Sequence, residues 1–230
     1  FPFAAKRCIA IHGRKPYMTP SHPPQRDISF KATCLRATLY ILFVGALMQG
    51  VFYEGTHLLG TRFSEAGFTE YMQSALLGLC SLLLIYVYYR LSHFRHLALL
   101  MFAFLFSSLI REQDAALDTY IFDGAWQVMV TLVILPSLYV VIRNRAAFLS
   151  EFSRFGDSFA FGMFAAGFLC TYVFSRLYGR GTFWEAVLAE RYLYNFKSAA
   201  EEITELFGYM LLLFAVIELI LLARRQLQRR

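Results

Sequence analysis

The stretch GYMLLLFAVIELILLA, residues 208–223, decides the fold class of this chain. It is apolar all round when wound as a helix, and Glu218 is its one charged side chain. A helix without a polar face belongs either in a large core or in a membrane. With the residues just before it, the apolar run covers 202–223, close to the ~20 residues that cross the hydrocarbon layer. The stretch therefore predicts a transmembrane helix.

Five further apolar runs of similar length precede it, at 35–53, 72–90, 96–111, 125–142 and 157–175. The 230 residues are 58% hydrophobic and 17% charged, which is too apolar for a soluble domain of this size. No run alternates as a barrel strand would. We therefore predict an all-α, polytopic integral membrane protein, a bundle of six transmembrane helices with the lipid bilayer as its solvent.

Charge on alternate sides of these spans predicts the orientation. The side with both termini, the 90–96 turn and the 143–157 loop carries 16 Lys/Arg and 4 Asp/Glu, and the other side carries 6 and 12. Basic residues near short loops mark the cytoplasmic face. We therefore predict cytoplasmic termini, in a bacterial inner membrane. The net charge of +6 divides between two opposite faces, so it does not indicate nucleic-acid binding.

The ends of the chain and the segment before the last span complete the domain organisation. Residues 1–32 are polar, basic and proline-containing, which predicts a mobile tail, of which 1–17 precede Met18 and need not be native. Residues 33–230 form the six-helix domain. Between Phe183 and Phe196, apolar side chains recur at helical spacing, which predicts an amphipathic helix lying in the membrane interface.

No known catalytic signature is present. The chain lacks G-x-S-x-G, H-E-x-x-H and Walker-type glycine loops, and its four cysteines form no C-x-x-C pair. Candidate functional residues are therefore sought among the charged side chains at the outer ends of the spans.

The segment REQDAALD, 111–118, continues the third span. Helical spacings of three and seven place Arg111, Asp114 and Asp118 on one face. Such a carboxylate pair, oriented by an arginine, could hold a cation or perform an acid/base step. A salt-bridged helix end is the alternative.

A second acidic group leads into the last span. Ser198 and Glu201 match the S-x-x-E capping box, which accounts for Glu201 and Glu202 by helix capping. Glu205 lies one turn deeper, where a carboxylate is costly unless it is paired or hydrated. We therefore predict Asp114, Asp118 and Glu205 as catalytic or metal-binding residues.

Three further residues could add to a metal site. Glu54 and His57 have the Glu-x-x-His spacing found in carboxylate-bridged di-metal bundles, although this chain has that pair once and those proteins have it twice. Glu70 opens the second span, where a helix-dipole role is the alternative. A divalent cation is the cofactor that these oxygen-rich groups suggest.

Arginines at the outer end offer a different chemistry. Arg176 and Arg180 lie four residues apart at the end of the fifth span, and Arg111 ends the third. The guanidinium fork matches phosphate oxygens, so these three residues are candidate contacts for an anion or lipid head group. Pairing with nearby acids is the alternative.

Three classes of function remain open. The first, which needs the fewest assumptions, is a binding or assembly protein whose outer face recognises a lipid head group or another membrane protein. The second is a metal-dependent membrane enzyme acting on a lipid-type substrate. The third is a transporter. The mid-membrane stretches argue against this class, because they are nearly free of ionisable residues.

Overall fold

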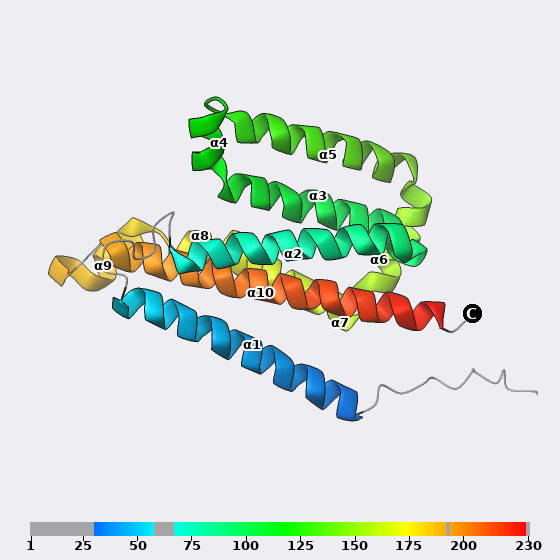
Figure 1. The fold of residues 1–230 in the computed structure, drawn as a ribbon, viewed down its shortest axis with the longest axis horizontal. Coiled ribbons are helices and arrows are strands. Elements are labelled where there is room, and N and C mark those ends of the chain that lie inside the picture. Colours follow the sequence, from blue (N-terminus) through cyan, green and yellow to red (C-terminus); the bar gives the residue numbers. More distant parts are fainter. Residues whose placement is uncertain (1–29, 58–66, 192–193, 229–230) are drawn as a thin grey trace, which may run out of the picture. The chain divides into compact units, whose positions relative to one another are not determined.

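The computed structural model describes residues 30–57, 67–191 and 194–228. All regular elements in these ranges are helices (Figure 1). Six helical stretches are long and apolar enough to cross a membrane, which confirms the predicted all-α polytopic class. They are Phe30–His57, Phe68–Arg90, Ser92–Glu112, Ala125–Arg143, Phe159–Tyr178 and Phe196–Leu227.

Contacts divide the chain after Thr38. Of the first unit, the described part is the beginning of α1 (Phe30–His57), where Arg36 Nε donates to the Ala32 carbonyl. The rest of α1 and every later element belong to the second unit, Leu39–Arg230. The predicted tail lies almost wholly outside the described residues, and the domain boundary after residue 32 stays a prediction.

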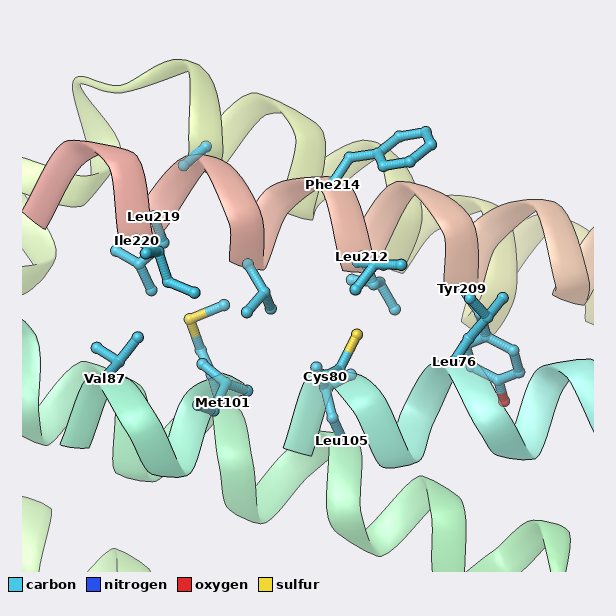
Figure 2. Packing of buried hydrophobic residues seen from close by; sticks show 14 of the residues in the cluster. Leu76, Cys80, Val87, Met101, Leu105, Tyr209, Leu212, Phe214, Leu219 and Ile220 are labelled. Atoms are coloured by element: carbon cyan, nitrogen blue, oxygen red, sulfur yellow. The ribbon is translucent and has the colours of Figure 1, made fainter. Parts of the chain in front are cut away.

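The last span, α10 (Tyr194–Leu227), is the centre of the second unit and the most deeply buried of the six spans. It packs against α2 (Phe68–Arg90) and α7 (Phe159–Phe168). Figure 2 shows Tyr209 and Leu219 of α10 directed toward α2, while Phe214 points away on the opposite side. There Phe214 stacks on Tyr40 of α1 at 4.1 Å between ring centroids. The all-round apolar character of 208–223 is thus explained by neighbours on several faces.

The third span ends earlier than the sequence suggests. α3 (Arg95–Glu112) stops at Gln113, whose φ of −105° and ψ of 16° are not helical, and α4 (Asp114–Tyr120) begins as a separate helix. Asp114 Oδ1 accepts the Ala115 N–H at 2.7 Å, so a short polar side chain competes with the continuing helix. The predicted single helical face through Arg111, Asp114 and Asp118 is therefore wrong.

Two other boundaries also differ from expectation. The 143–157 loop is a helix, α6 (Arg145–Gly156), which follows α5 (Ala125–Arg143) after Asn144. The expected 183–196 helix is shorter: α9 (Gly181–Leu188) ends at Ala189, which has a φ of +48°, and η3 (Ala189–Arg191) follows. Because α10 already begins at Tyr194, Ser198 lies inside that helix, and the predicted capping box is wrong.

The fifth span contains a π-helical segment. α7 continues into η2 (Leu169–Phe174), which has π-helical hydrogen bonding, and then into α8 (Ser175–Tyr178). Thr171 of this segment lies against Gly208 of α10 so closely that a Cβ on Gly208 would overlap the Thr171 side chain. One turn earlier, a Cβ on Gly167 would stand 2.9 Å from the Gly208 carbonyl oxygen. The small residues thus allow the fifth and sixth spans to approach closely.

Candidate functional site

A cluster of polar side chains lies where α2 and α10 begin and α3 and the fifth span end. We call it the polar cluster, and its members come from α2, α3, η2, α8 and α10. They are Gln73, Arg111, Glu112, Tyr172, Ser175, Arg176, Lys197, Glu201, Glu202, Glu205 and Tyr209.

Glu205 is the buried anchor of this cluster. Its residue is 3% exposed, and Oε1 lies 2.7 Å from Arg176 Nη2. Ser175 Oγ lies 3.3 Å from the same oxygen and also donates to the Thr171 carbonyl. A carboxylate inside a span needs such partners, because bare burial of its charge is costly. The prediction that Glu205 is not a simple capping residue is consistent with this arrangement.

Arg176 connects Glu205 to the rim of the cluster. Its Nη1 donates to Glu201 Oε1 at 2.7 Å, and Lys197 Nζ lies 2.9 Å from the other Glu201 oxygen. Glu201 and Glu205 stand one helical turn apart, so one guanidinium fork reaches both carboxylates. The Arg176 side chain is nevertheless 42% exposed. The ion pairs with Glu201 and Glu205 therefore fix the orientation of the guanidinium group, while part of the Arg176 side chain remains accessible to solvent.

Glu112 forms the second pairing in the cluster. Tyr209, which is fully buried on α10, donates its hydroxyl to Glu112 Oε1 at 2.8 Å, and Figure 2 shows this hydroxyl directed away from α10. Arg111 Nη2 lies 3.3 Å from the same oxygen. Tyr172 lies edge-on to Tyr209 at 6.5 Å and shares a 2.6 Å hydrogen bond with Ser108. Arg111 and Arg176 thus pair with acids, as the salt-bridge alternative expects, and their role as anion contacts stays a prediction.

Gln73 is one of several cluster members that the sequence did not identify as site residues. It is fully buried on α2, and its Nε2 donates to both the backbone oxygen and Oε2 of Glu202, each at 2.9 Å. Its Oε1 is buried and has no hydrogen-bond donor within the described part of the chain. A buried acceptor without a donor loses the free energy of hydration and gains nothing in return. An amide in an otherwise apolar run was the signal that could have identified it.

These groups act as one electrostatic unit. Glu205 interacts through its charge with Glu112 and Glu202 as well as with Arg111 and Arg176. The cluster holds four carboxylates against Arg111, Arg176 and Lys197, so the carboxylates are in excess by one when all are ionised. Added hydrogen-bond donors or a cationic group would therefore be favourable here.

Asp114 and Asp118 bind local backbone groups instead. Asp114 is exposed, and its Oδ1 accepts the N–H of Ala115 in the first turn of α4. Asp118 Oδ1 accepts the N–H of Gly124 at 3.0 Å and so holds the turn where Gly124 adopts a φ of +81°. No contact joins either residue to Glu205 within the described chain.

The side chains of Glu54 and His57 lie in different surroundings. Glu54 is fully buried, and its Oε2 accepts the Thr69 N–H at 2.9 Å and the Thr69 hydroxyl at 2.5 Å, so it caps the beginning of α2. His57 is exposed, stacks on Tyr53 at 4.5 Å and lies 2.7 Å from the Thr56 hydroxyl through Nδ1. Glu70 is partly buried in the first turn of α2. Within the described ranges, no three His, Cys, Asp or Glu residues are arranged to hold a metal ion, and the metal site stays a prediction.

Arg180 stands apart from the polar cluster. Its side chain is exposed, and its carbonyl accepts the N–H groups of Phe183 and Trp184 at the start of α9. Its predicted role as an anion contact is therefore supported by position only.

The polar cluster can recognise a ligand that carries both charges. Guanidinium donors lie beside carboxylate and amide acceptors, and the bilayer is the natural source of small amphiphiles with that pattern.

Comparison of the chain with protein-family models, with curated proteins and with solved structures finds no match.

Proposed function

We propose that this protein binds a phospholipid head group that carries a phosphate and a primary ammonium, and that the polar cluster is the binding site. The observation that carries the proposal is Arg176, which is fixed by two carboxylates and yet 42% exposed. A preorganised guanidinium at the end of a transmembrane bundle lies at the depth of lipid phosphates. Binding there needs little further ordering of the side chain.

The phosphate would contact Arg176 and Arg111. An arginine has five N–H donors, and the two salt bridges of Arg176 leave others able to point outward. The Arg111 side chain is 39% exposed beside Glu112. Two guanidinium groups offer the bidentate geometry that suits phosphate oxygens.

The ammonium of the lipid head group would contact carboxylate and amide oxygens of the polar cluster that accept too few hydrogen bonds within the described chain. Glu202 is partly buried and paired with Gln73, whose own Oε1 has no donor in the described chain. The carboxylate excess of the cluster favours a cation at this position. A quaternary ammonium has no N–H and would satisfy these acceptors less well, which gives the proposal a chemical test.

The test compares two lipids that differ only in this group. Wild-type protein in nanodiscs is expected to have a higher Tm with dioleoylphosphatidylethanolamine added than with dioleoylphosphatidylcholine added, because only the former donates hydrogen bonds from its ammonium. Arg176→Lys keeps the charge near Glu205 but loses the fork, and it should lose most of this difference. Arg180→Lys is the matched control and should keep it.

Two results would overturn the proposal: equal Tm values with both lipids in the wild type, or a full phosphatidylethanolamine gain in Arg176→Lys. Gel filtration of each variant before reconstitution establishes that the comparison is made on folded protein.

The orientation of the protein is part of the same proposal. Excess Lys and Arg at the end with α6 and the C-terminal part of α10 indicates cytoplasmic termini, and we propose a bacterial inner membrane as the location. With the four cysteines replaced by serine, Thr119→Cys should react with a membrane-impermeant maleimide in intact cells and Ala146→Cys should not. Both positions are exposed on the protein. The reverse pattern would invert the orientation.

A further inference from the structure

A second candidate site lies at the opposite end of the bundle, where η1 (Ser92–Phe94) turns the chain from α2 into α3. A pocket of about 270 Å³ opens between this turn and α6. We call it the α6 pocket, and six residues line it. They are Ser92, His93, Ala147, Ser150, Glu151 and Arg154.

Arg154 gives this pocket its cationic group. It is exposed, its Nη2 donates to the His93 carbonyl at 3.1 Å, and its guanidinium carbon lies 5.5 Å from the centre of the Phe94 ring. These contacts position the guanidinium and use few of its five donors. The hydroxyls of Ser92 and Ser150 add two donors beside it.

The carboxylate in the α6 pocket is already engaged. Glu151 is buried, and its two oxygens accept from the Leu97 backbone N–H at 2.8 Å and pair with His96 Nδ1 at 2.8 Å. Glu151 thereby caps the beginning of α3. Both carboxylate oxygens of Glu151 are therefore engaged by groups that do not line the pocket, so an anion at Arg154 would not face a carboxylate without partners.

His93 adds an unsatisfied polar atom to the same place. Its Nδ1 is buried without a hydrogen-bond partner among the described residues. A ligand group that reached this nitrogen would supply its missing hydrogen-bond partner.

An apolar groove of about 280 Å³ lies along a neighbouring face of α6. It is lined by leucine, methionine and phenylalanine side chains of α3, α6 and α7. Leu97 links the two sites, because its N–H binds Glu151 and its side chain lines the groove. On α6, Ser150 and Arg154 face the pocket, while Phe152 and Phe155 line the groove. One helix thus presents a polar face to one cavity and an adjacent aromatic face to the other.

We propose that the α6 pocket and the apolar groove together bind one anionic phospholipid, with its phosphate at Arg154 and one acyl chain along the groove. Charge complementarity selects the occupant: Arg95 and Arg224 lie at the same end of the bundle and favour an anionic lipid over a zwitterionic one. The apolar lining of the groove suits a hydrocarbon chain, which a free phosphate lacks. This inference is independent of the proposed function, which concerns the opposite end and a different lipid.

The experiment measures lipid binding to detergent-purified full-length protein by native mass spectrometry. Dioleoylphosphatidylglycerol is expected to bind more tightly than dioleoylphosphatidylcholine. Arg154→Gln should weaken the phosphatidylglycerol affinity about tenfold or more, because it removes a charge-assisted hydrogen bond. Arg145→Gln removes the same charge from the first turn of the same helix and should change the affinity less than about twofold, a screened surface effect.

Two further arms distinguish a lipid from a free anion. Dihexanoylphosphatidylglycerol has the same head group with short chains and should bind more weakly than the dioleoyl form, while inorganic phosphate should not displace the dioleoyl lipid at equal concentration. Equal losses in Arg154→Gln and Arg145→Gln would overturn the proposal, since general surface charge would then explain binding. Equal affinity of the two chain lengths, or displacement by phosphate, would overturn the role of the groove.

Discussion

Replacing Arg176 with methionine is expected to lower the free energy of unfolding by about 1–3 kcal/mol, because it leaves the buried Glu205 carboxylate without its ion pair while solvent screens the exposed part of Arg176. Glu205, which is 3% exposed, would lose its 2.7 Å partner and keep a single 3.3 Å hydrogen bond from Ser175. Glu201 would lose its arginine as well but keeps Lys197. Unfolding of the protein in mixed micelles with increasing SDS, followed by circular dichroism, measures the change.

A double variant distinguishes the loss of the ion pair from the loss of side-chain packing. Arg176→Met combined with Glu205→Leu removes the uncompensated charge and should recover most of the lost stability, because an apolar pair of similar volume often replaces a buried ion pair without loss. Arg180→Met, at an exposed position, should stay within about 0.5 kcal/mol of the wild type. If Arg176→Met unfolds at the same SDS fraction as Arg180→Met, the buried pair contributes nothing to stability.

Replacing Gly208 with alanine is expected to lower the free energy of unfolding by about 3 kcal/mol, the upper part of the range for overpacked cores. The added methyl group would overlap the Thr171 side chain, and it would stand 2.9 Å from the Thr171 backbone nitrogen. A side chain can change its rotamer, but the backbone atom can move only if η2 shifts away from α10. Thermal unfolding in detergent measures the loss.

Gly78 and Gly162 provide the control for that experiment. A Cβ at either position meets nothing within 4 Å. Alanine there should leave stability unchanged or raise it by up to about 1 kcal/mol through helix propensity. A Gly208→Ala protein as stable as these two variants would show that the fifth and sixth spans do not pack as closely as the contact at Thr171 implies.

The number and class of the helices could be predicted because the bilayer imposes a length and a polarity on each span. What could not be predicted were the interruptions within apparent helices. Gln113 ends α3 because Asp114 offers a local backbone partner, and the spacing argument through Arg111 assumed a helix that continues. Hydropathy also could not distinguish the helix α6 from a loop, because α6 is too polar to resemble a span.

Part of the candidate site could also be predicted, because the bilayer restricts where charged side chains can lie. The prediction singled out Arg111, Arg176 and Glu205 at the ends of spans, and these three side chains lie in the polar cluster, since charged groups in an apolar chain gather where water or partners are available. Which acid meets which arginine depends on the rotation of each helix, and an unexpected π-helical segment sets that rotation in the fifth span. The metal-enzyme and transporter hypotheses stay predictions.

The π-helical segment η2 also has an evolutionary consequence. A π-helical turn is what one extra residue in an α-helix produces, so deleting a single residue between Leu169 and Phe174 could restore a regular helix. Every later residue of the span would then turn by about 100° relative to α7. A single deletion would therefore move both Ser175 and Arg176 away from Glu205. The length of this segment therefore matters for the ion pair as much as the identity of the charged side chains, and we expect that related chains without the extra residue also lack the buried carboxylate.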